Sequence, residues 1–101
     1  MNVELIENFY DHHENANVRF VGFTTNDVRY DFGIVYTSLF FGKPLVVCMQ
    51  TGRSALMDAG DATDLEFIQH RFKIGEKGEA EDLSAFFREA IPFSTLEEQY
   101  E

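Results

Sequence analysis

Alternation of apolar and polar side chains predicts two neighbouring β-strands in the first half of the chain. Between residues 28 and 37 an apolar side chain recurs at every second position: Val28, Tyr30, Phe32, Ile34 and Tyr36. A similar alternation starts at Val18 and Phe20. A period of two residues is the signature of a strand with one apolar face. Asn26 and Asp27, between the two segments, tolerate the left-handed backbone of a tight hairpin. We therefore expect an antiparallel hairpin here.

Three more segments are predicted to extend this hairpin into a five-stranded sheet. Residues 45–50 are apolar on both faces, which is typical of a central strand. The turn Thr51-Gly52 then leads into a short strand at 54–57. Between residues 68 and 74, apolar positions alternate with Gln69, Arg71 and Lys73. This last alternation predicts a fifth strand whose outer row is basic.

The period changes to that of a helix near the C-terminus. Apolar side chains fall at helical spacing, at Leu83, Phe86, Phe87, Ala90 and Ile91. Acidic residues crowd the start, where the helix dipole favours anions, and Pro92 sets the end. We expect an α+β fold in which a five-stranded antiparallel meander sheet is covered by a C-terminal helix. We expect residues 1–101 to form a single domain, with 1–8 and 92–101 as ends that are flexible or docked separately.

Composition narrows the class of protein further. The formal net charge is −10, and the chain has eleven Phe and one cysteine, Cys48. A single cysteine excludes an intramolecular disulfide and suits a reducing compartment. The apolar stretch 34–41 falls far short of the roughly 20 residues that span a bilayer. The acidic N-terminus lacks the positive charge of a signal peptide. We expect a cytoplasmic protein that avoids anionic membranes.

Candidate chemistry is sparse. Asp11-His12-His13-Glu14 lacks the i, i+4 histidine spacing with which a helix binds zinc, and the acids of 58–66 lack the spacing of a calcium loop. Cys48 lies in an apolar run, where a core residue is expected, and His70 falls on the apolar face of its predicted strand. We expect no catalytic residue, no metal site and no cofactor.

Four segments of the chain carry a resemblance to a known family. They are RFVGF at 19–23, FGIVYT at 32–37, FGKPLVV at 41–47 and MQTGR at 49–53. Together they resemble a domain-of-unknown-function family of small acidic proteins from low-GC Gram-positive bacteria, number three thousand and fifty-five in that series. The resemblance covers residues 9–91 and implies a compact cytoplasmic domain. It implies no activity and no site residue.

The most informative cluster is a predicted basic row with an aromatic residue beside it. Its members are Arg19, Phe23, Arg29, Arg71 and Lys73. On one sheet face such residues can stack and bind single-stranded bases. The alternative is that the cations pair with Asp31, Glu66 and the acidic ends, which a net charge of −10 favours.

Two functions follow from these observations. The first is a small acidic regulatory or adaptor protein that binds a protein partner, because no catalytic machinery is recognisable. Exposed strand edges also make a homodimer plausible. The alternative is a single-stranded nucleic-acid binder that uses the basic sheet face.

Overall fold

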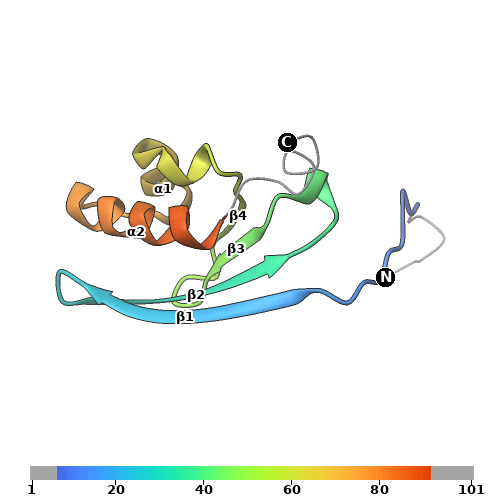
Figure 1. The fold of residues 1–101 in the computed structure, drawn as a ribbon, viewed down its shortest axis with the longest axis horizontal. Helices are drawn as coiled ribbons and strands as arrows, with labels where there is room; N and C mark the ends of the chain where they lie inside the picture. The colour runs from blue at the N-terminus through green and yellow to red at the C-terminus, as the bar shows by residue number, and fades with distance from the viewer. Residues whose placement is uncertain (1–6, 92–101) are drawn as a thin grey trace.

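The computed structural model describes residues 7–91, which form an α+β fold with a four-stranded antiparallel sheet and two α-helices. The strands lie in the order β1-β2-β3-β4, and both helices lie on one side of the sheet (Figure 1). Their bounds are β1 Asn17–Thr25, β2 Val28–Tyr36, β3 Leu45–Cys48 and β4 Ser54–Leu56. The α+β class and the antiparallel sheet are confirmed, but the prediction of five strands is wrong. What the sequence predicts for residues 1–6 and 92–101 lies outside the described residues.

The β1–β2 hairpin is the longest element of the sheet. Asn26 and Asp27 both have positive φ, 51° and 62°, as a two-residue turn of this kind requires. The register pairs Phe23 with Tyr30 and Val21 with Phe32. This register places Val21 and Phe23 on the core face beside Phe32 and Tyr30, whereas Val18 and Phe20, where the alternation of β1 starts, lie on the opposite face.

Most of the segment predicted as a fifth strand, residues 68–74, lies in helix α1, Leu65–Phe72. Asp64 caps it, because its carboxylate accepts a hydrogen bond from the Phe67 amide at 3.1 Å. Ile68 and Phe72 lie one turn apart and are both buried. Lys73 ends the helix in the left-handed conformation, φ 54°. The alternation of 68–74 also fits the i, i+4 spacing of a helix, and the cap at Asp64 decides between the two structures.

Helix α2, Lys77–Ala90, supplies the other wall of the core. Phe87 is fully buried, and the centroid of its ring lies 5.2 Å from that of Phe32, edge to face. The Phe72 ring of α1 meets Phe32 in the same manner at 5.4 Å. Phe32 therefore contacts both helices from the middle of the sheet, a geometry that aromatic pairs favour.

The acidic loop between β4 and α1 has a structural role. The Asp58 amide donates to Asp61 Oδ2 at 3.1 Å, and the Asp61 amide donates to Asp58 Oδ1 at 2.7 Å. This second bond is the main cause that lowers the pKa of Asp58. From α2, Ser84 Oγ donates to the carbonyl of Ala62 at 2.6 Å. The loop is thus a set of caps and turns that fixes the approach to α1.

Glu14 joins the segment before β1 to the end of β2. Its carboxylate accepts hydrogen bonds from the Thr37 hydroxyl, from the Ser38 amide at 3.2 Å and from the Ser38 hydroxyl at 2.7 Å. The bond from Thr37, followed by those from Ser38, lowers the pKa of Glu14 to about 2 from an ordinary 4.5. Hydrogen bonds to the ionised form are the cause of such a decrease.

We expect Phe87→Ala to destabilise the fold by about 3–5 kcal/mol, because it empties a fully buried site. Phe86, the next residue, is only partly buried, and Phe86→Ala should cost about 1–2 kcal/mol. Urea denaturation of both variants measures the two losses. Equal losses would contradict the packing of α2 described here.

We expect the Glu14 carboxyl to titrate near pH 2. Since the folded pKa lies below the ordinary one, Glu14 stabilises the fold above pH 4.5, and this stabilisation is lost as the pH falls toward 2. Carboxyl chemical shifts followed by NMR measure the midpoint. Thr37→Ala should raise it, whereas Thr24→Ala, near the other end of the hairpin, should not. A wild-type midpoint near 4.5 would show that the Glu14 contacts do not form.

Candidate functional site

The five residues of the predicted basic row do not share a face. Arg19 and Phe23 lie on the side of β1 that faces the helices. Arg19 Nη1 lies 3.0 Å from Glu89 Oε2 of α2, and its guanidinium lies 5.6 Å from the ring centroid of Phe86. Phe23 packs against the same Phe86 ring at 5.3 Å. Both residues therefore hold α2 to the sheet.

The other three cations lie elsewhere. Arg29 is on the opposite face of the sheet, where it makes two hydrogen bonds to Asp31, at 3.0 and 3.2 Å. Arg71 lies on α1, with its guanidinium 5.3 Å from the ring centroid of Phe67. Lys73 is the exposed residue that ends α1. The basic sheet row needs a fifth strand, and that segment is helical.

The more informative surface is the sheet face that points away from both helices. Cross-strand pairing places two rows on it, one through Val18 and Val35, the other through Phe20 and Gly33. β3 and β4 extend both rows. We call this surface the open sheet face; its apolar members are Val18, Phe20, Val35, Leu45, Val47, Met49 and Leu56. Among residues 7–91, neither helix covers it (Figure 1).

Phe20 is the largest side chain of the open sheet face. It is 72% exposed, and Val18 and Met49 beside it are 48% and 54% exposed. Phe20 lies over Gly33, because a Cβ added at Gly33 would stand 3.1 Å from the Phe20 ring and 3.8 Å from Met49 Sδ. The absence of a side chain at Gly33 thus makes room for the Phe20 ring and the Met49 thioether. Together with Val18, these two side chains form an apolar platform that is exposed to solvent.

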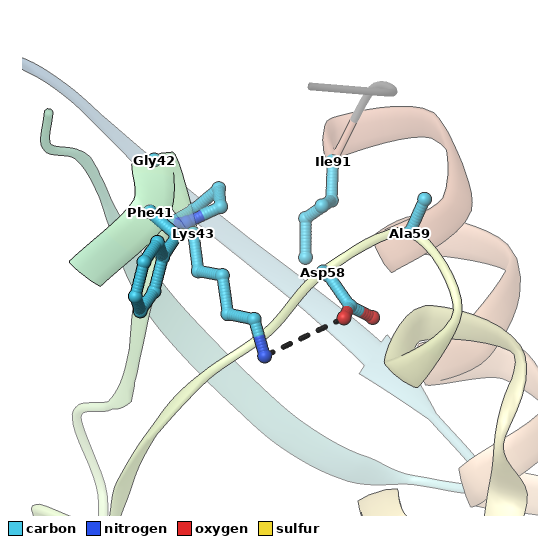
Figure 2. Close-up of a pocket in the computed structure, with 7 residues that line it drawn as sticks. Phe41, Gly42, Lys43, Asp58, Ala59 and Ile91 are labelled. Carbon is cyan, nitrogen blue, oxygen red and sulfur yellow. Dashed lines mark ion pairs between the residues drawn. The ribbon is translucent and has the colours of Figure 1, made fainter. Parts of the chain in front are cut away.

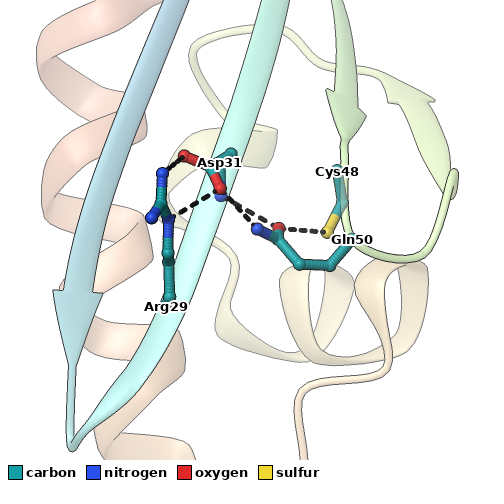
Figure 3. A network of polar contacts seen from close by, with 4 residues as sticks. All are labelled: Arg29, Asp31, Cys48 and Gln50. Atoms are coloured by element: carbon teal, nitrogen blue, oxygen red, sulfur yellow. Dashed lines mark hydrogen bonds and ion pairs between the residues drawn. The ribbon is translucent and has the colours of Figure 1, made fainter.

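A polar network borders this platform (Figure 3). Asp31 accepts from Arg29 and from Gln50 Nε2 at 2.6 Å, and the Asp31 amide donates to Gln50 Oε1 at 2.9 Å. The hydrogen bond from Arg29 is the main cause that lowers the pKa of Asp31. Cys48 Sγ lies 3.8 Å from the same Gln50 oxygen. Because Cys48 is 1% exposed, we assign it a packing role rather than a nucleophilic one.

A second feature is a small hollow of about 110 Å³ where the turn before β3, the acidic loop and the end of α2 meet (Figure 2). Lys43 Nζ and Asp58 Oδ2 are 3.5 Å apart across it. Ile91 and the Gly42-Pro44 turn supply apolar walls. Phe41 stands at its rim and is 99% exposed. The one ion pair neutralises the lining charges, so the hollow offers no convergent catalytic groups.

A buried carboxylate lies on the helix side of the hairpin. Glu79 of α2 is 6% exposed and accepts a hydrogen bond from the Tyr30 hydroxyl at 2.6 Å. Asn26 Nδ2 lies 3.5 Å from its other oxygen. Burial, followed by the contact with Glu79, raises the pKa of Tyr30. Since each group satisfies the other, we assign the pair to anchoring the first turn of α2.

Sequence reasoning missed the open sheet face, although the signal for it was present. Val35, Leu45 and Val47 are apolar at positions where a solvent-facing row is normally polar. Cross-strand register is needed to show that they adjoin Val18 and Phe20. Only the pairing of the strands shows that the two rows are contiguous.

The comparisons with known proteins identify a family. The sequence profile described as SAV0927-like matches residues 9–89, most of the chain, and the protein belongs to this family. The description states no activity or ligand. A search of curated proteins found no match. Within residues 7–91, neither helix combines the length and the apolar character needed to cross a membrane.

We expect Gly22→Ala to disrupt the network at Asp31 without unfolding the protein. An alanine Cβ at position 22 would overlap Asp31 Oδ1, which accepts a hydrogen bond from Arg29, so we expect the carboxylate to move and to lose this contact. NMR titration should then show a higher pKa for Asp31, with a stability loss of about 1 kcal/mol or less, as for exposed ion pairs. Gly78→Ala, which meets no atom within 4 Å, should leave that pKa unchanged. An unaltered Asp31 pKa in Gly22→Ala would contradict the network.

Proposed function

We propose that this member of the SAV0927-like family is a small adaptor that binds a partner protein through its open sheet face. The observation that carries the proposal is the apolar platform on the open sheet face, the side of the sheet that neither helix covers. An antiparallel sheet with one solvated face normally alternates apolar and polar side chains. Here Phe20, Val18 and Met49 stand in solvent instead. Contiguous exposed apolar surface is characteristic of interaction sites.

The geometry of the platform supports binding of a protein. Phe20 is an aromatic side chain that rests on the backbone at Gly33, so little rotamer freedom is lost when a partner covers it. Large aromatic anchors contribute most of the energy of many interfaces. The Arg29–Asp31–Gln50 network beside it provides a polar rim, as interfaces typically have.

The negative net charge of the chain indicates which kind of partner it can bind. The formal net charge of −10 repels a second copy of the chain and a phosphate backbone alike. Arg19 and Arg29 are both engaged by carboxylates. We therefore propose a neutral or basic protein as the partner. The experiment below would also detect binding of single-stranded nucleic acid, the alternative hypothesis, or formation of a homodimer.

The finer expectations from the sequence remain proposals of the same kind. They are the numbered family of low-GC Gram-positive bacteria, the cytoplasmic location and the regulatory role. Each agrees with a small acidic domain that offers a binding face. The identity of a partner found in the following experiment would bear on all three expectations.

Photocrosslinking tests the proposal. A photoreactive phenylalanine analogue replaces Phe20 in one preparation and Phe41, which is 99% exposed but outside the open sheet face, in another. In extract of the source cells, we expect a discrete adduct with one protein from position 20 and none from position 41. Unlabelled wild-type protein and Phe41→Ser should compete for this adduct, whereas Phe20→Ser should not, because its apolar anchor is gone.

Three results would contradict the proposal. They are an adduct with nucleic acid, an adduct between two copies of the chain, and the same adducts from positions 20 and 41. Because Phe20 is 72% exposed, Phe20→Ser should keep the thermal midpoint of the wild type within a few degrees, about the effect of 1 kcal/mol or less. This control separates loss of binding from loss of folding.

A further inference from the structure

A second candidate site lies where the β3–β4 turn meets the last turn of α1. A hollow of about 260 Å³ opens there, lined by Arg53, Ser54, His70 and Arg71. All four side chains can donate hydrogen bonds, and none of them is acidic. This is notable in a chain with 18 acidic and 8 basic residues. The inference that follows does not rest on the proposed adaptor function.

The backbone on both sides of the hollow is fixed. In the turn, the Gly52 amide donates to the Cys48 carbonyl at 2.7 Å, and the Cys48 amide donates to the Arg53 carbonyl at 2.8 Å. Gly52 has φ 75°, which suits glycine. On α1, the Arg71 guanidinium rests 5.3 Å from the ring centroid of Phe67. The Arg71 guanidinium is thus held against an aromatic ring, and Arg53 belongs to a hydrogen-bonded turn.

The charges of the hollow are not neutralised within the described chain. Among residues 7–91, no carboxylate lies within ion-pair distance of Arg53, His70 or Arg71, whereas Arg19, Arg29 and Lys43 each have one. Two guanidinium groups that line one hollow repel each other, and an anion bound between them would offset this repulsion. The end of α1 attracts cations through its dipole, but that accounts for Arg71 and not for Arg53.

We infer that this hollow binds a phosphate monoester or inorganic phosphate, held by Arg53 and Arg71 with Ser54 and His70 as further donors. The planar fork of arginine matches phosphate oxygens in pairs. A monoester carries a charge near −2 at pH 7, which matches two guanidinium groups, whereas a phosphodiester carries −1. The volume is below the roughly 300–1,000 Å³ of pockets for drug-sized ligands, so it suits one phosphate group.

Titration of the whole chain at constant ionic strength tests the site. The probes are inorganic phosphate, a phosphoserine peptide and diethyl phosphate, each followed by amide and side-chain NMR shifts. We expect saturable shifts at Arg53, Ser54, His70 and Arg71 with the first two probes and weaker binding of the diester. Tighter binding of the peptide would identify a phosphorylated protein as the source, and tighter binding of phosphate a small molecule.

Matched variants separate a built site from general attraction. Arg53→Gln and Arg71→Gln should each weaken phosphate binding about tenfold or more, the loss of one charge-assisted contact. Lys77→Gln removes the same charge from the exposed start of α2 and should change affinity less than about twofold. Arg53→Lys keeps the positive charge but lacks the planar guanidinium, so its affinity for phosphate should lie between those of the wild type and Arg53→Gln. Absence of saturable shifts at the four residues, or equal losses in Lys77→Gln and Arg53→Gln, would overturn the inference.

Discussion

The packing of Phe32 against both helices is the contact on which the structure depends. Its ring stands in the middle of β2 and meets Phe72 of α1 and Phe87 of α2 edge to face. One aromatic residue thereby joins three elements that are distant in sequence. Because both helices converge on the same side, the sheet has one covered face and one open face. The interior and the open sheet face therefore have a common origin in one strand.

The alternation of β2 explains how one strand serves both faces. The side chains of Phe32 and Ile34 point into the core and are fully buried, while Asp31 and Gly33 occupy positions on the outer face. Gly33 lacks a side chain, so the Phe20 ring of β1 lies over it. The two faces of β2 thus differ in kind: one is filled by aromatic packing, and the other carries a ring exposed to solvent.

Four strands were predictable because the alternation of β2, the turn at Asn26-Asp27, the apolar run of β3 and the turn at Gly52 all agree on the same structure. The fifth was wrong because Ile68 and Phe72 satisfy a strand and a helix equally well. Only the cap at Asp64 and burial against α2 distinguish them. The predicted basic row needs that strand for Arg71 and Lys73, and the register places Arg19 and Arg29 on opposite faces of the sheet. Long-range register and helix docking, which no local pattern encodes, decide which side chains become neighbours.

Solvent accessibility measured with a soluble paramagnetic probe tests the central claim most directly. In an NMR experiment on the whole chain, the Phe20 ring and the Val18 methyl groups should be strongly relaxed by the probe, and the Phe32 ring and the Ile68 methyl groups should be protected. This is the result that a sheet covered on one face predicts. Protection of Phe20 to the same degree as Phe32 would contradict it, because the open sheet face would then be part of the interior.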